Sequence, residues 1–258
     1  MNELHVSFIQ ADLHWENPLE NLKMFAEKIE QISKPTDLII LPEMFSTGFS
    51  MSPEKLAETE DGVSVNWMKS TAQEKGCVLT GSLIIKENNQ YYNRLFWVNP
   101  DGTYQTYNKR HLFSLAGEEN HYSAGTERLI VKLKGFKIMP LICYDLRFPV
   151  WSRNDLDYDL LIYVANWPER RSFFWNQLLI ARAIENQSYV IGVNRVGDDG
   201  NQIYHSGNSI CLDPLGGEVM KAEPGKSETI SCVLSKDTVN RVREKFRFLN
   251  DKDSFRIA

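Results

Sequence analysis

Short apolar runs of strand length alternate with segments of helical periodicity along much of the chain, and this alternation constrains the fold most. An alternation of this kind, with turn residues between the segments, is typical of α/β folds. The runs expected to form buried strands lie at residues 4–10, 37–43, 77–85, 136–143, 158–165 and 189–196. The segments expected to form helices lie at 17–33, 63–75, 173–187 and 236–246.

Two other parts of the chain depart from this alternation and predict antiparallel pairing. Asn88-Asn89 and Asn99-Pro-Asp-Gly102 are turn signals that bound strand-like runs, and similar signals recur near the C-terminus. Residues 111–127 show no period and are expected to form a long loop, which inside a compact domain is usually functional. The sequence therefore predicts one mixed α/β domain spanning residues 1–258. The additional strands are expected at 91–98, 103–107, 128–133, 203–212, 217–222 and 228–234.

Composition excludes several classes of protein. The net charge of -5 argues against a nucleic acid or an anionic membrane surface as the main partner. No apolar run of about 18 residues predicts a membrane span, and the N-terminus does not resemble a signal peptide. The four cysteines are dispersed, which favours reduced thiols and a cytoplasmic location. Three of them lie in apolar strand-like runs and are interpreted as structural: Cys77, Cys211 and Cys232.

Three predicted strands end in residues that could carry chemistry: Glu43, Lys109 and Cys143. Each has an ordinary structural explanation, as a surface carboxylate, a solvated basic patch or a core thiol. On one rim of a sheet, however, they would supply a base, an electrophilic clamp and a nucleophile. A cysteine–histidine pair is the alternative, and His111 is the histidine that best suits it.

The motifs around these residues resemble those of the nitrilase superfamily of carbon–nitrogen hydrolases. They are Leu-Pro-Glu43-Met-Phe, Tyr-Asn-Lys109-Arg-His-Leu-Phe and Ile-Cys143-Tyr-Asp-Leu-Arg-Phe-Pro, in that order, followed by Ala-Asn-Trp-Pro168 and Ala-Arg-Ala-Ile-Glu185-Asn. The resemblance covers nearly the whole chain. It implies a four-layer α-β-β-α sandwich of two mixed six-stranded sheets, assembled into homodimers or larger homo-oligomers.

The resemblance also implies a role for each matching residue. Cys143 would be the nucleophile that forms a thioester, and Glu43 would be the general base and acid. Lys109 would stabilise the oxyanion together with the backbone N–H of Tyr144. A second carboxylate is expected after the lysine, and the family spacing selects Glu118 over its neighbour Glu119.

Within the superfamily the chain most resembles the omega-amidases, which hydrolyse the terminal amide of 2-oxoglutaramate and 2-oxosuccinamate. We therefore expect a small amide substrate and no metal or organic cofactor. A nitrilase, an N-carbamoyl amino acid hydrolase or an amidase for deaminated glutathione is an alternative within the class. A non-catalytic binding protein with the same fold is an alternative outside it.

The residues that would bind the rest of the substrate are less clearly marked. Arg147 is a candidate for the substrate carboxylate, although a structural salt bridge, for example to Glu185, is the explanation that we favour for it. Arg170 and Arg171 are the other cations expected near the rim. Aromatic residues expected to form the pocket walls are Tyr144, Phe45 and Trp167.

Overall fold

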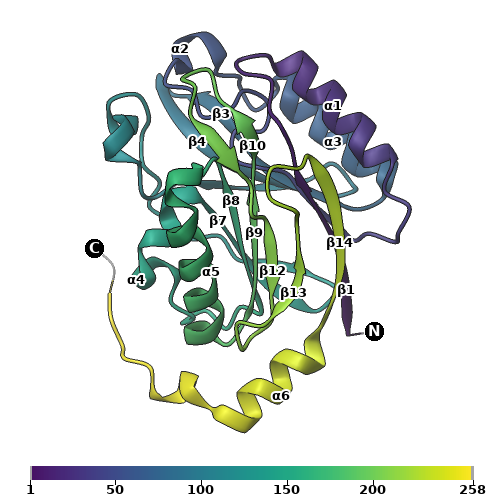
Figure 1. Cartoon of the computed structure of the whole chain (residues 1–258), viewed down its shortest axis with the longest axis vertical. Coiled ribbons are helices and arrows are strands. Elements are labelled where there is room, and N and C mark those ends of the chain that lie inside the picture. The colour runs from purple at the N-terminus through teal and green to yellow at the C-terminus, as the bar shows by residue number, and fades with distance from the viewer. Residues whose placement is uncertain (1, 257–258) are drawn as a thin grey trace.

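Two six-stranded sheets pack against each other in the computed structural model, which describes residues 2–256 (Figure 1). The central strands of each sheet, β1 to β3 and β7 to β9, are parallel, and the outer strands pair antiparallel. In spatial order the first sheet consists of β14 (Glu228–Ser235), β1 (Glu3–Gln10), β2 (Leu38–Ile40), β3 (Val78–Glu87), β4 (Gln90–Val98) and β5 (Tyr104–Asn108). The second consists of β13 (Glu218–Lys221), β12 (Ile210–Leu212), β9 (Tyr189–Asn194), β8 (Leu160–Ala165), β7 (Phe136–Ile142) and β6 (Val131–Leu133).

Helices cover the outer face of each sheet, so the predicted α-β-β-α sandwich is confirmed (Figure 1). On the first sheet, α1 (Pro18–Glu30) and α3 (Val63–Lys75) bury apolar side chains such as Phe25 and Met68. On the second sheet, α5 (Ser172–Asn186) buries Trp175 and Leu179. Between the sheets, β1 lies against β9 and β4 against β7. Each sheet is therefore buried on both faces, as its nearly continuous apolar strands require.

Local sequence signals explain where the helices begin and end. The side chain of Asn17 accepts a hydrogen bond from the backbone N–H of Glu20 at 3.4 Å, and Pro18 occupies the first turn of α1. Gly76 ends α3 in the left-handed conformation at φ 62°. The last helix, α6 (Lys236–Phe246), has the predicted bounds.

The prediction of one strand over residues 203–212 was wrong. Gly207 and Asn208 have φ of 76° and 59°, which extended backbone does not allow, and they divide the run in two. The first part, β11 (Tyr204–Ser206), pairs with β10 (Val196–Asp198) in a separate hairpin, and the second part is β12 of the second sheet. Short elements that the periodicity did not predict are α2 (Pro53–Leu56), α4 (Pro149–Ser152), and the 3-10 turns η1 (Ser114–Ala116), η2 (Glu118–Asn120), η3 (Cys143–Arg147), η4 (Glu169–Arg171) and η5 (Phe248–Asp251).

The carboxyl ends of parallel strands from both sheets meet at one place. Glu43 follows β2 of the first sheet, whereas Asn166 follows β8 of the second, and their side chains and backbones are hydrogen-bonded to each other. Cys143 follows β7, the neighbour of β8. Strand ends of this kind are where α/β proteins usually place their functional residues. Within residues 2–256, no helix has the length and apolar character needed to cross a membrane.

Candidate active site

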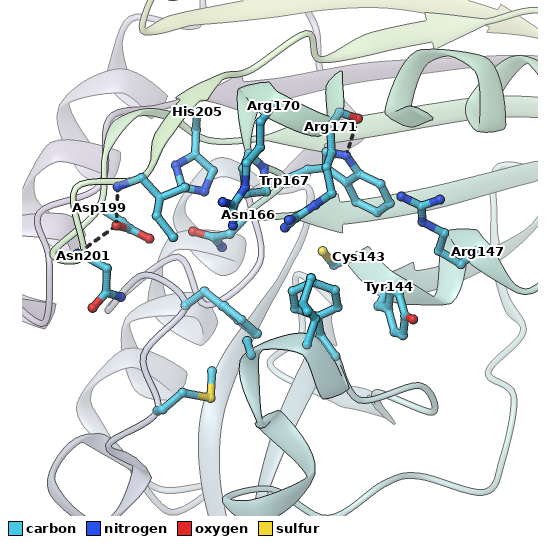
Figure 2. Close-up of a pocket in the computed structure, with 17 residues that line it drawn as sticks. Cys143, Tyr144, Arg147, Asn166, Trp167, Arg170, Arg171, Asp199, Asn201 and His205 are labelled. Atoms are coloured by element: carbon cyan, nitrogen blue, oxygen red, sulfur yellow. Dashed lines mark hydrogen bonds between the residues drawn. The ribbon is translucent and has the colours of Figure 1, made fainter. Parts of the chain in front are cut away.

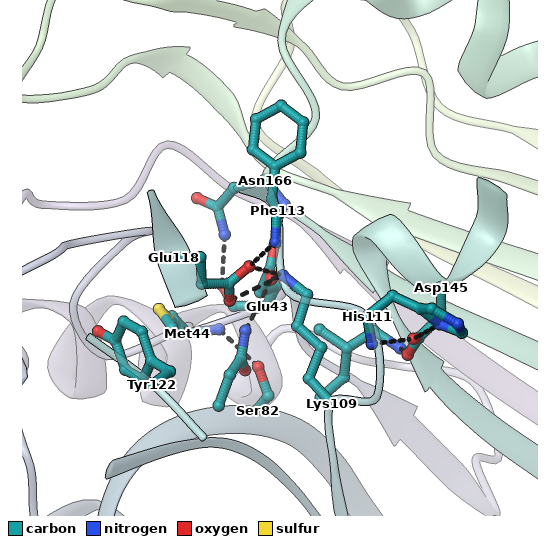
Figure 3. A network of polar contacts seen from close by, with 12 residues as sticks. Glu43, Met44, Ser82, Lys109, His111, Phe113, Glu118, Tyr122, Asp145 and Asn166 are labelled. Atoms are coloured by element: carbon teal, nitrogen blue, oxygen red, sulfur yellow. Dashed lines mark hydrogen bonds and ion pairs between the residues drawn. The ribbon is translucent and has the colours of Figure 1, made fainter. Parts of the chain in front are cut away.

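Glu43, Lys109 and Glu118 form a buried ionic group, here called the carboxylate–lysine cluster (Figure 3). The Lys109 Nζ donates to Glu43 Oε1 at 2.9 Å and to the two carboxylate oxygens of Glu118 at 2.9 and 2.8 Å. The side chains of all three residues are fully buried. Lys109 thus bridges two carboxylates that are distant from each other in the sequence and holds them together away from bulk water.

Hydrogen bonds fix the Glu43 carboxylate on three of its four acceptor positions. Oε1 accepts from Asn93 Nδ2 at 2.8 Å as well as from Lys109, and Oε2 accepts from the backbone N–H of Asn166 at 2.8 Å. The side-chain amide of Asn166 donates in turn to the backbone carbonyl of Glu43 at 2.6 Å. A carboxylate offers about four lone-pair sites. One site on Oε2 therefore remains for a proton from a neighbouring group.

The charges within this cluster stabilise one another. Burial opposes the positive charge of Lys109, but the negative charges of Glu118 and Glu43 outweigh it and raise the pKa of the lysine. Burial also raises the pKa of Glu118, against the opposing effect of Lys109. The ammonium is consequently held in its charged form across the physiological pH range.

Backbone geometry places Glu118, rather than Glu119, on the lysine. Gly117 has φ of 71° and begins the short turn η2, whose first residue is Glu118. The Glu118 Oε2 also accepts a hydrogen bond from the backbone N–H of Phe113 at 2.6 Å. Glu119, by contrast, is exposed.

Cys143 begins a tight turn directly after the buried strand β7. Its φ is 43°, a left-handed conformation that is uncommon for residues other than glycine and that often marks functional sites. Asp145 stabilises the turn, because its Oδ2 accepts from the backbone N–H of Ile142 at 3.0 Å and from the Tyr107 hydroxyl at 2.7 Å. Burial and the negative charge of Glu43 raise the pKa of the Cys143 thiol well above its ordinary value. The thiol is therefore protonated at neutral pH.

His111 does not form the alternative cysteine–histidine pair. Its Nδ1 lies 2.8 Å from Asp145 Oδ1, and its ring stacks on Phe148 with 3.7 Å between the centroids. The groups that act most strongly on the Cys143 thiol are Glu43, Lys109 and Glu118. His111 instead supports the turn that carries the cysteine, through Asp145.

A pocket of about 350 Å³ opens onto Cys143 (Figure 2). Among the predicted pocket residues, Tyr144, Trp167 and Arg147 line it. Phe45 does not, because it is fully buried beneath the sheet, with its ring edge-on to Phe25 at 5.6 Å. Lining residues that the sequence did not single out as pocket walls include Phe49, Phe113, Asn166, Ile203 and His205.

Comparison with known proteins places this geometry in a family. The family model for carbon–nitrogen hydrolases matches residues 5–244. The chain belongs to the carbon–nitrogen hydrolase family. Among similar proteins, "Omega-amidase YafV" of Yersinia enterocolitica is 46% identical over 99% of both chains, and a "2-oxoglutaramate amidase" of Bacillus subtilis is 37% identical over 87% of this chain and 88% of the relative. The crystal structure of a CN-hydrolase superfamily protein from Xanthomonas campestris, which has an arsenic adduct in its active site, superposes with a TM-score of 0.97 at 40% identity over the full length of both chains.

In this carbon–nitrogen hydrolase, the structural salt bridge that we favoured for Arg147 is absent among the described residues, so that expectation was wrong. Glu185 pairs with Arg182, whose Nη1 lies 2.9 Å from its Oε1, because both are on α5 one turn apart. The guanidinium of Arg147 lies over the rings of Trp167 and Phe174, at 5.2 and 4.8 Å from their centroids. Arg147 thus lines the hydrolase pocket at the edge next to α5.

Sequence reasoning missed the residues that hold this hydrolase site together, namely Asn93, Asp145 and Asn166. A signal for Asn166 was available, since it follows a buried strand just as Cys143 and Glu43 do. Asn93 offered no such signal, because it lies within the antiparallel strand β4. Within the described residues 2–256, no three His, Cys, Asp or Glu side chains are grouped as a metal site requires.

Proposed function

We propose that this carbon–nitrogen hydrolase is an omega-amidase, which hydrolyses the terminal amide of short 2-oxo acid amides such as 2-oxoglutaramate and 2-oxosuccinamate. The observation that carries the proposal is a thiol that lines a small pocket and lies beside the carboxylate–lysine cluster. The identity of 46% to a protein named as an omega-amidase, and of 37% to one named as a 2-oxoglutaramate amidase, supports the substrate class.

Glu43 activates the nucleophile in the first step. The thiol of Cys143 is protonated at rest, so its proton passes to the free lone pair of Glu43 Oε2 while the sulfur attacks the amide carbonyl carbon. The C–S bond forms as the carbonyl π electrons move onto oxygen. Glu43 then delivers the same proton to the amide nitrogen, the C–N bond breaks, and ammonia leaves behind a thioester.

Lys109 and the backbone N–H of Tyr144 stabilise the oxyanion that forms on this path. At rest all three N–H groups of Lys109 are used, one toward Glu43 and two toward Glu118. One of the two bonds to Glu118 can pass to the oxyanion while the other keeps the ammonium in place. A donor held in this way in a dry site is worth about 100- to 1000-fold in rate.

Water completes the cycle in the second step. Glu43 takes a proton from water as the oxygen attacks the thioester, and Lys109 stabilises the second oxyanion. Collapse of this intermediate expels the Cys143 sulfur, which recovers the proton from Glu43. The products are the 2-oxo dicarboxylic acid and the original thiol, so Glu43 serves as base and acid in both halves.

Substrate comparison tests the proposal. We expect ammonia release from 2-oxoglutaramate and 2-oxosuccinamate to exceed, in kcat/KM, the turnover of matched nitriles, N-carbamoyl amino acids and deaminated glutathione. Ammonia release is also expected to survive exhaustive chelation, since none of the steps above uses a metal. Preference for a nitrile or an N-carbamoyl acid, or activity that a metal restores after chelation, would overturn the assignment.

Alkylation distinguishes this enzyme from a non-catalytic binding protein. Brief treatment of the native protein with iodoacetamide is expected to label Cys143, beside its base, and to spare the other thiols. Cys143 lines the pocket, whereas Cys77, Cys211 and Cys232 are buried and are not among its lining residues. Equal labelling of all four cysteines, together with a lack of amidase activity, would favour a binding protein.

We also propose that the enzyme acts as a homodimer or larger homo-oligomer in the cytoplasm. Exposed apolar side chains on α5, namely Phe173, Phe174 and Ile184, support association through this helix. Light scattering of the purified protein tests the assembly, with Phe173→Glu expected to favour the monomer. A monomeric wild-type protein at micromolar concentration would contradict it.

A further inference from the structure

The pocket above Cys143 carries positive charge without matching negative charge. Arg147, Arg170 and Arg171, here called the arginine group, line it, whereas Asp199 is the one acidic residue among the described lining residues. The Asp199 Oδ1 already accepts the backbone N–H groups of Asn201 and Ile203, at 2.8 and 3.0 Å, and so is held within its own loop.

This surplus is unusual for the chain, because most of its other buried or half-buried arginines have an acidic partner. In the described residues 2–256, the arginine group makes no ion pair within 4.0 Å. Paired guanidinium groups elsewhere are Arg94 with Glu60 and Glu87, Arg128 with Asp155, Arg182 with Glu185, Arg195 with Asp12, and Arg243 with Asp159. A guanidinium that is partly desolvated without a partner favours an anionic ligand.

Arg171 is the member of the group that is aimed at the reacting thiol (Figure 2). It ends the turn η4, where its backbone carbonyl accepts from Trp167 Nε1 at 2.8 Å and its backbone N–H donates to Pro168 at 3.0 Å. Its guanidinium lies over the ring of Phe113, 5.0 Å from the centroid. Burial and the charge of Arg170 lower the pKa of Arg171. This is the effect expected for a guanidinium whose positive charge is not balanced by a neighbouring carboxylate.

The other two arginines are placed less well for a ligand that also reaches Cys143. Arg170 is exposed, so water screens its charge. Arg147 is held between the rings of Trp167 and Phe174 at the edge of the pocket next to α5. Only Arg171 combines partial burial, a fixed turn and a direction toward the sulfur.

We propose that Arg171 binds the carboxylate of the substrate and thereby selects amides of short dicarboxylic acids over uncharged amides. This inference rests on the proposed function, because it names the part of the pocket that recognises the acid end of the substrate. Cys143 and Arg171 line the same pocket, so an acid amide whose amide carbon is at Cys143 can extend its carboxylate toward the guanidinium. The planar guanidinium can then bind it through two parallel N–H bonds.

The experiment measures binding without requiring turnover. The probe is 4-oxopentanoate, a ketone with the shape of succinamate that cannot be hydrolysed, and its uncharged methyl ester is the control ligand. Each is tested for its ability to protect Cys143 of the full-length protein from iodoacetamide. Wild-type protein is expected to be protected by the acid at a concentration about 10- to 100-fold lower than by the ester, as for a charge-assisted hydrogen bond.

Three variants locate the source of this preference. Arg171→Gln is expected to remove the advantage of the acid over the ester, and Arg171→Lys to retain part of it. Arg170→Gln has the same change in charge in the same turn and is expected to keep the full preference. The rate of alkylation without ligand, and the thermal unfolding midpoint, show whether each variant retains its pocket.

The outcomes separate this inference from the proposed function. Equal protection by acid and ester in the wild type, an unchanged preference in Arg171→Gln, or loss of the preference in Arg170→Gln instead, would overturn the role of Arg171. A preference that depends on Arg171 in a protein that does not hydrolyse 2-oxo acid amides would keep the carboxylate site and overturn the omega-amidase assignment.

Steady-state kinetics provide a second test of Arg171. In Arg171→Gln, kcat/KM for succinamate is expected to fall about 10- to 100-fold, mainly through KM, while kcat/KM for methyl succinamate changes little.

Discussion

The carboxylate–lysine cluster and the arginine group both adjoin Cys143, and they differ in how their charges are balanced. In the cluster, one ammonium is bound by two carboxylates and all three side chains are fully buried. In the arginine group, three guanidinium groups share a pocket with one aspartate that is already hydrogen-bonded to its own loop. The charges of the carboxylate–lysine cluster are balanced without a ligand, whereas those of the arginine group are not.

This difference separates the two tasks of an enzyme. Groups that stabilise a transition state act best when they are already oriented, because no reorganisation is then needed during the reaction. Groups that choose a substrate act best when the substrate supplies the missing charge, because a wrong substrate leaves that charge unpaired. The contrast predicts that mutations in the two regions affect stability and activity differently.

The largest effect is expected for Lys109→Met, which leaves Glu43 and Glu118 buried without their counter-charge. Loss of one partner of a buried ionic group costs about 3–5 kcal/mol, and kcat should fall on the order of 1000-fold. Denaturant unfolding at pH 7.5 and steady-state kinetics measure the two quantities. Arg171→Met is the matched control, and its free energy of unfolding should change by about 1 kcal/mol or less. Equal destabilisation by the two substitutions would contradict the contrast.

The second-largest effect is expected for Glu118→Gln, which keeps the shape of the side chain but removes the charge that holds Lys109. An ammonium on a flexible stem is aimed poorly without its partner, and we expect kcat to fall about 100-fold while the fold survives. Glu119→Gln, next to it and exposed, should change kcat by less than about twofold, as surface substitutions usually do. If Glu119→Gln is the inactive variant, the lysine is held in a different way during catalysis.

A smaller effect is expected for Arg147→Gln, which tests whether Arg147 or Arg171 is the arginine that binds the carboxylate. Because its guanidinium lies over Trp167 and Phe174 at the edge of the pocket, we expect KM for succinamate to rise only about two- to fivefold. The preference of the protein for 4-oxopentanoate over its methyl ester should persist. A loss of that preference would transfer the carboxylate site from Arg171 to Arg147.

The smallest effect is expected when the pH of the assay is changed, and this experiment tests whether the Cys143 thiol is protonated before it attacks. The raised pKa of Cys143 means that the folded protein holds this proton at pH values where an ordinary thiol, with a pKa of about 8.5, ionises. Since Glu43 takes the proton during attack, kcat/KM should change by less than about twofold between about pH 7 and pH 9, whereas a reaction through free thiolate would gain about 100-fold, because below its raised pKa the thiolate fraction grows about tenfold per pH unit. A rise of that size would show that the thiol ionises before attack.

The sequence predicted the parts of this site that lie at strand ends and could not predict those that depend on how the strands are paired. Glu43 and Cys143 follow apolar runs, which periodicity detects without a structure. Asn93 reaches Glu43 from the middle of β4, and only the pairing of β4 with its neighbours determines which of its side chains face the site.

Local backbone geometry explains two of the predictions that failed. Phe45 was expected in the pocket, but Met44 has φ of 43°, which turns the chain after β2 and directs the next ring into the core beside Phe25. The run 203–212 was expected as one strand, but left-handed residues at 207 and 208 divide it between two sheets. A pattern of residue types does not show which residues adopt a left-handed backbone conformation in the folded chain.

Phe113 joins the two regions through two different parts of one residue. Its backbone N–H binds Glu118 at 2.6 Å, whereas its ring supports the guanidinium of Arg171. Every amino acid except proline supplies the same N–H, so the side chain at this position can change while the contact to Glu118 stays. In the evolution of such enzymes, a lineage could therefore exchange one substrate for another by substitutions at position 113 without interrupting its inherited chemistry.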